Sequence, residues 1–157
     1  MNINDVVSLL EKYPSIDDEI NMYRKVLSDL LDTYKRSIGT VKFDSQPKAK
    51  VKNNAESVVE NTVVNMPENI KDDIDICNNL IGELQSLKTE TLKEVSRLEY
   101  YQKKVVFNFY FYNMKWKDIS KQLGYTDRQC RNIRDRALIS LLPVFERNKI
   151  IIAYINN

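Results

Sequence analysis

The stretch that decides the fold is Trp116–Leu142, which reads WKDISKQLGYTDRQCRNIRDRALISLL. Its pattern predicts one helix over residues 116–123 and a second that opens at Thr126. Gly124 stands where a chain leaves a helix through a left-handed residue, a conformation that Gly adopts cheaply. Thr126 can cap the second helix, and Gln129, three residues on, can reach back to complete a capping box. The sequence therefore predicts a helix-turn-helix.

Both predicted helices have an apolar face. Trp116, Ile119 and Leu123 share one face of the first helix, and Ser120 is small where the two helices must approach closely. The apolar face of the second helix consists of Cys130, Ile133, Ala137, Leu138 and Leu141. We expect these two faces to form the core of a small helical domain.

The opposite face of the second helix is polar and basic. A helix that enters the major groove of DNA needs donors for guanine, amides for adenine and cations for phosphate. This face offers all three, with four arginines in nine residues. A solvated basic helix is the plain alternative, but the capped turn in front of it favours DNA binding. The face consists of Arg128, Gln129, Arg131, Asn132, Arg134, Asp135 and Arg136.

Charge is unevenly distributed along the 157 residues. Residues 100–157 hold 11 Lys and Arg against 4 Asp and Glu, whereas residues 1–99 hold 13 against 18. This asymmetry indicates a polyanionic partner for the C-terminal part. It also indicates that the acidic N-terminal part is kept away from phosphate and meets protein instead.

Composition excludes several classes of protein. No apolar run approaches the roughly 20 residues of a membrane span, and no secretory signal opens the chain, so we expect a cytoplasmic protein without membrane contact. The chain has no histidine and no Cys-x-x-Cys, so the usual zinc sites and the commonest general base are missing. We therefore expect no cofactor, no metal and no enzyme activity. Cys77 and Cys130 are expected to be buried free thiols in a reducing compartment.

The remaining pattern predicts an all-α fold. Residues 1–39 are expected to form an N-terminal helical segment for oligomerisation. In it, a helix over 3–13 has Ile3 on its apolar face and is stopped by Pro14, and Ser15 caps a second helix that reaches about residue 38. A core helix of a bundle or a self-associating helical hairpin would each explain this pattern, and the two are not exclusive.

A flexible linker is expected over 40–68, from its Pro, Asn, Ser and spaced Lys residues. A long helix is then expected over 69–99, with an apolar stripe that includes Leu92 and is interrupted by Lys88 and Thr91. A dimer seam or an intramolecular bundle would each satisfy this stripe. Acids near the start of the helix suit its dipole and are not expected to hold a metal.

Residues 100–157 are expected to form the DNA-binding domain with a C-terminal tail. The aromatic segment 100–113 is interpreted as a supporting helix, whose rings close a small core and do not form a stacking surface. The tail over 143–157 ends in IIIAYI, an apolar run that we expect to pack on the domain or on a second copy.

Residues 105–142 resemble region 4 of bacterial sigma factors. Ser120 departs mildly from the Ala that is usual in that region. The whole chain is similar to phage late-gene transcriptional activators of the RinA/ArpU type, which carry such a unit at the C-terminus. The opening is also similar, through LEKYP at 10–14 and D-x-E-I-x-x-Y-R-x-x-L at 17–27. The residues that carry the sigma likeness are Trp116, Ile119, Leu123, Gly124, Tyr125, Thr126, Arg128, Arg131, Arg136, Ala137, Leu138 and Leu141.

This resemblance implies a phage or prophage protein that binds double-stranded DNA upstream of packaging and structural genes and activates late transcription in the bacterial host. A homo-oligomer, dimer or tetramer, is expected, and a contact with host RNA polymerase stays open. The implied base-reading residues are Thr126, Asp127, Arg128, Gln129, Asn132 and Asp135. The implied phosphate-binding residues are Lys115, Lys117, Lys121, Arg131, Arg134 and Arg136.

Two rival functions remain. A small terminase subunit, which serves DNA packaging, also combines a helix-turn-helix with an oligomerising part, although that family more often places the DNA-binding unit first. A sigma factor is a nearer alternative, but no sequence resembling the promoter-melting region 2 is recognisable.

Overall fold

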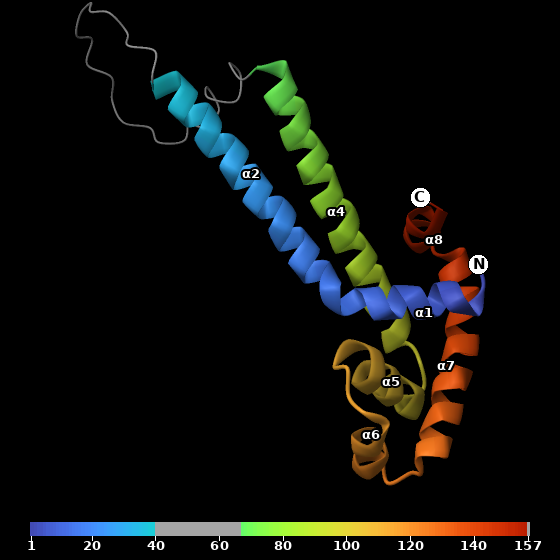
Figure 1. Cartoon of the computed structure of the whole chain (residues 1–157). Helices are drawn as coiled ribbons and strands as arrows, with labels where there is room; N and C mark the ends of the chain where they lie inside the picture. The colour runs from blue at the N-terminus through green and yellow to red at the C-terminus, as the bar shows by residue number, and fades with distance from the viewer. Residues whose placement is uncertain (40–66, 157) are drawn as a thin grey trace, which may run out of the picture. The chain divides into compact units, whose positions relative to one another are not determined.

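The computed structural model describes residues 1–39 and 67–156, and no described residue lies in a strand (Figure 1). The predicted all-α fold class is confirmed for this part of the chain. None of the described helices is long and apolar enough to cross a membrane. Almost all of the predicted linker, 40–68, lies outside the described residues. The elements are α1 (Ile3–Lys12), η1 (Tyr13–Ser15), α2 (Ile16–Gly39), α4 (Glu68–Ser96), α5 (Tyr100–Val106), η2 (Phe107–Phe111), α6 (Trp116–Leu123), α7 (Asp127–Arg147) and α8 (Lys149–Asn156).

The chain divides into two compact units. Unit 1 consists of Met1–Ile20 and Gly82–Asn157, and unit 2 consists of Asn21–Ile81. The segment expected at 1–39 is thus shared between the two units. In unit 2, Tyr34 of α2 and Cys77 of α4 are buried. Its exposed large apolar side chains are Met22, Val26 and Ile76.

The core of unit 1 is built around α7, which contacts α1, α5, α6 and α8. Apolar side chains at helical spacing on α7 are fully or almost fully covered, as expected for a helix with neighbours on several sides. Ile151 anchors α8 and has no exposed surface, so the apolar run packs on unit 1 in part, while Ile150 and Tyr154 are 40% and 38% exposed. The prediction for Ile3 is wrong: its side chain is 41% exposed, whereas Val6 and Leu10 are fully buried.

The junction between α1 and α2 is tighter than predicted. Pro14 does end α1, but the chain makes a single 3-10 turn, η1, and α2 begins at once at Ile16. Pro is tolerated there because the first residues of a helical turn have no partner for their N–H groups. Ser15 was predicted to cap α2 and does not: its hydroxyl donates to the carbonyl of Lys12 at 2.9 Å. The capping box lies instead at the start of α1, between Asn2 and Asp5.

The predicted supporting helix over 100–113 is not a regular α-helix. It ends at Val106 and continues as a π-helical turn, Phe107–Phe111. A π turn contains one more residue than an α turn, so it changes which side chains face the core. Asn108 is buried here, and its amide donates to the side-chain oxygen of Gln122 in α6 at 2.7 Å. Phe111 stacks on Tyr13 with ring centroids 3.9 Å apart, which joins the π turn to η1.

Pro143 was predicted to begin the C-terminal tail. It lies instead inside α7, which continues to Arg147. Pro lacks the N–H that would bond to the carbonyl of Ile139, four residues earlier. Side chains on both sides of the proline offset that loss, because Leu141 and Phe145 are each at most 1% exposed. Burial of an apolar side chain contributes about 1.5–3 kcal/mol, similar to the cost of a proline in a helix.

The buried stripe of α4 follows a different line from the predicted one. Two steps of four residues lead from Leu87 through Thr91 to Val95, all of which have at most 1% exposure. Leu92 lies one residue off this line and is 37% exposed, so its assignment to the stripe is wrong. Lys88 was expected to interrupt the apolar stripe. It does not disrupt the packing, because its ammonium group pairs with Asp17 at the start of α2.

Candidate nucleic-acid interface

Local sequence signals position α6 and α7. The predicted bounds of the first helix, Trp116–Leu123, are confirmed. Gly124 has φ of +70°, the left-handed conformation predicted for it. The predicted capping box is also confirmed: the Thr126 hydroxyl accepts from the Gln129 N–H at 3.2 Å, and the Gln129 side-chain oxygen accepts from the Thr126 N–H at 2.9 Å. Two reciprocal hydrogen bonds therefore stabilise the start of α7.

A compact core lies beneath the turn. Val105 of α5, Ile119 of α6 and Cys130 of α7 have no exposed surface and form its centre. Burial raises the pKa of the Cys130 thiol, and the nearby Asp127 carboxylate raises it further, so this cysteine stays neutral. Cys77 is likewise buried and free, as predicted. The side chains that pack against the centre are Phe109, Met114, Trp116, Leu123, Tyr125 and Ile133.

All six predicted base-reading side chains are on the surface of unit 1. They occupy the cap and the first half of α7, outside the buried line through Cys130, Ala137 and Leu141. This arrangement leaves their donors and acceptors accessible to a large partner. The six exposed residues are Thr126, Asp127, Arg128, Gln129, Asn132 and Asp135.

The predicted phosphate-binding residues divide into two groups. Lys115, Lys117, Lys121, Arg131 and Arg136 are exposed and form no ion pair within the described part of the chain. Arg134 is different. Its side chain is only 27% exposed, and two of its nitrogens contact one carboxylate oxygen of Asp135, at 2.6 and 2.9 Å.

Trp116 links three elements at the edge of this surface. Its indole stacks on Phe109 of the π turn, with ring centroids 4.2 Å apart and an interplanar angle of 21°. The guanidinium carbons of Arg131 and Arg134 each lie 5.5 Å from the centre of the same indole, within the range of a cation–π contact. Trp116 was expected on the apolar face of α6, and its contact with the two arginines was not predicted.

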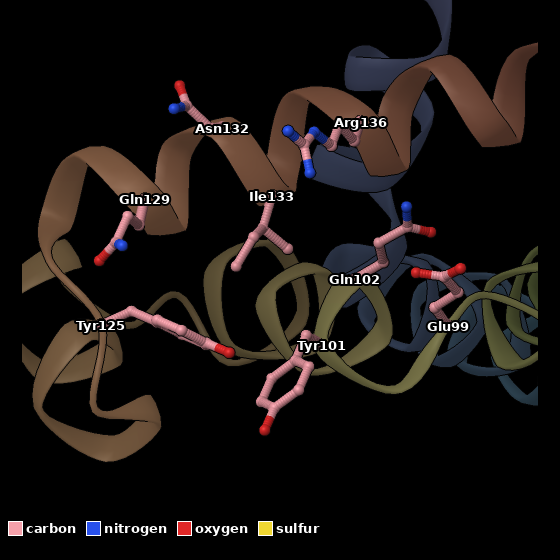
Figure 2. Close-up of a pocket in the computed structure, with 8 residues that line it drawn as sticks. All are labelled: Glu99, Tyr101, Gln102, Tyr125, Gln129, Asn132, Ile133 and Arg136. Atoms are coloured by element: carbon pink, nitrogen blue, oxygen red, sulfur yellow. The ribbon is translucent and has the colours of Figure 1, made fainter.

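A groove of about 400 Å³ runs between α5 and α7 (Figure 2). Ile133 points from α7 towards Tyr101 and Tyr125 on the opposite wall, while Asn132 points away from them. The two tyrosine rings meet edge to face at 5.3 Å. A hydrogen bond with Tyr101 raises the pKa of the Tyr125 hydroxyl, and burial adds to this rise. The residues lining the groove are Glu99, Tyr101, Gln102, Tyr125, Gln129, Asn132, Ile133 and Arg136.

Only one wall of the groove consists of residues that were predicted to bind DNA. Gln129, Asn132 and Arg136 were predicted as DNA-binding residues, and they form one wall. The opposite wall comes from Glu99, Tyr101 and Gln102, which were not predicted as binding residues, although 100–113 was expected to support the domain.

Within the described residues, no group of three or more Cys, Asp or Glu side chains is close enough to hold a metal ion. Comparison of the chain with models of protein families, with curated proteins and with solved structures finds no match.

Proposed function

We propose that this protein binds double-stranded DNA with α7 in the major groove, and acts by binding and not by catalysis. The observation that carries the proposal is the exposed first half of α7, which presents Arg128, Gln129 and Asn132 directly behind a capped turn. The major groove is about 12 Å wide and admits one α-helix. Arginine pairs with guanine, and amide side chains pair with adenine. We therefore propose that these three residues contact the base edges.

Cations at the edges of this surface suit the phosphates. Lys115, Lys117 and Lys121 lie at the start and along α6, which contacts α7. Phosphate contacts fix the orientation of a protein on the duplex, while contacts to base edges specify the sequence. With Arg131 and Arg136, the lysines give α7 a cationic border of the kind that a groove-binding helix needs.

The biological role we propose is activation of phage late genes for packaging and structural proteins. This part rests on the resemblance to RinA/ArpU-type activators and to sigma region 4. One such unit covers a short site, so we propose a homo-oligomer on a repeated or palindromic operator, with host RNA polymerase as a further partner.

The proposal is tested with the full chain and a tiled library of the DNA that flanks its gene, with the mass of the protein measured in the same buffer. One tight site upstream of an operon, bound by a dimer or tetramer, is the expected result. Weak and uniform binding by a ring of about eight or more subunits would favour a packaging adaptor instead. No binding to any fragment at low salt would overturn the proposal.

Two variants then separate the roles of the residues. Arg128→Ala is expected to cost about 1–3 kcal/mol at the true site and little elsewhere, because it removes a bidentate contact to guanine. Lys121→Ala is the matched control. It should weaken binding to all sequences alike and lower the dependence on salt by about one phosphate contact. Unchanged affinity of Arg128→Ala for the true site would contradict the assignment.

A further inference from the structure

The guanidinium groups of two arginines lie over the indole of Trp116, but only one of these arginines forms an ion pair within the described residues. Arg131 and Arg134 lie one turn apart on α7, and both guanidinium carbons are 5.5 Å from the ring centre. Two like charges at this spacing repel each other. The Asp135 carboxylate compensates the positive charge of Arg134 through two short hydrogen bonds, at 2.6 and 2.9 Å. Arg131 has no ion pair within the described residues, and its charge remains available.

The indole itself is well placed to hold these side chains. Phe109 stacks on it at 4.2 Å and belongs to a π turn whose residues Asn108 and Tyr110 are buried. Trp116 also packs against the core centred on Ile119. A ring fixed in this way restrains any guanidinium that lies over it, and tryptophan offers the strongest cation–π contact of the aromatic side chains.

We infer that Trp116 is a positioning residue of the proposed DNA interface: it holds the Arg131 guanidinium in advance for a phosphate, while Arg134, paired with Asp135, is a structural neighbour and not a phosphate ligand. This inference rests on the proposed function. It also assigns different roles to Arg131 and Arg134, both of which the family resemblance implies to be phosphate-binding residues.

The expected advantage is entropic. A long side chain that is free in the unbound protein loses conformational freedom when a phosphate fixes it, and this loss weakens binding. Arg131 has already lost part of that freedom over the indole. Trp116→Leu should therefore weaken DNA binding about two- to tenfold, the usual range for ordering one flexible side chain. The slope of log affinity against log salt should stay the same, because Arg131 still neutralises one phosphate.

The first experiment measures DNA affinity and salt slope for single and double variants. Arg131→Ala should lower the slope by about 0.9, whereas Arg134→Ala should leave it unchanged. The loss caused by Trp116→Leu should disappear in an Arg131→Ala background and persist in full in an Arg128→Ala background. Arg128→Ala is the matched control, since it removes an exposed arginine of the same helix whose guanidinium does not lie over the indole. Equal losses in both backgrounds would overturn the inference.

Trp116→Phe tests whether the ring, and not the fold, matters. Phenylalanine keeps an aromatic face and should recover most of the affinity that leucine loses. Thermal unfolding by circular dichroism should be recorded beside each titration. If affinity follows the midpoint of unfolding across the wild type and both variants, Trp116 has only a structural role and the inference fails.

A second experiment needs no DNA. NMR of the arginine side-chain Nε–H groups should show Arg131 and Arg134 ordered in the wild type, and Arg131 mobile in Trp116→Leu. A mobile Arg131 in the wild type would overturn the positioning role, whether or not the protein binds DNA. An ordered Arg131 together with no DNA binding at low salt would instead overturn the proposed function, and the role of Trp116 in it.

Discussion

The side-chain amide of Asn148 donates a hydrogen bond of 2.8 Å to a carboxylate oxygen of Glu90, 58 residues earlier in the chain. The oxygen of the same amide accepts from the N–H groups of Ile150 and Ile151, at 3.2 and 3.4 Å. One side chain therefore caps α8 and also joins the α7–α8 junction to α4. Both ends of the amide are used, so neither Asp nor Ser can replace it fully.

Asn148→Ala should lower the free energy of unfolding, by about 1 kcal/mol for the lost cap alone. Urea denaturation at pH 7 measures the change. Asn148→Asp is the informative control, because it keeps the capping oxygen but places a carboxylate against Glu90. At pH 7 this variant should also be less stable than the wild type, and acidification should narrow the gap. An alanine variant as stable as the wild type would show that α8 holds without this residue.

Stability should also depend on the protonation of Glu90. The hydrogen bond from Asn148, followed by that from Lys93, holds the pKa of the Glu90 carboxyl below its usual value of 4.5. A lowered pKa in the folded state means that this contribution is fully present above pH 4.5 and is lost as the pH falls through the folded value. Urea denaturation between pH 7 and pH 3 should show the wild type losing more stability than Glu90→Gln. Parallel curves for the two proteins would rule out this linkage.

The same substitution should have opposite effects at two glycines. Gly124 has φ of +70°, and an added Cβ would meet no atom within 4 Å, so Gly124→Ala should cost about 1–2 kcal/mol through the backbone alone. Gly82 lies inside α4 and has the same open space around it, so Gly82→Ala should stabilise by about 0.5–1 kcal/mol. Thermal unfolding of the two variants gives both signs. A stabilising Gly124→Ala would mean that the turn is not left-handed in solution.

Thr91 should tolerate the loss of its hydroxyl. Its side chain has no exposed surface, and the hydroxyl oxygen has no hydrogen-bond partner among the described residues. A buried polar group without a partner costs about 1–3 kcal/mol, so Thr91→Val should be at least as stable as the wild type. Thr91→Ala removes the methyl group as well and should be less stable than Thr91→Val. A valine variant with a clearly lower unfolding midpoint would indicate that the hydroxyl has a partner.

The features that could be predicted from the sequence depend on residues that are close together in the chain. The bounds of α6, the left-handed Gly124 and the Thr126–Gln129 capping box are set by residues within four positions of one another. The apolar faces of α6 and α7 follow from helical spacing in the same way. Nothing in these features depends on a distant part of the chain, and the structure has them as predicted.

The features that could not be predicted depend on distant contacts. The π turn at Phe107–Phe111 is accompanied by the Asn108–Gln122 hydrogen bond, and Pro143 stays in α7 because its neighbours are buried. Trp116 looks like an ordinary core residue until α7 brings Arg131 over it. Spacing along one helix says nothing about which side chains from another helix arrive there.

The division of unit 1 into Met1–Ile20 and Gly82–Asn157 has a consequence for synthesis on the ribosome. Helix α1 contacts α7, and roughly a hundred residues must be translated between them, which takes about 5–20 seconds. During that time Val6, Leu9 and Leu10 have no α7 to cover them. The nascent chain thus carries α1 as an uncovered apolar helix, a suitable site for a chaperone, and unit 1 closes only after α7 has been translated.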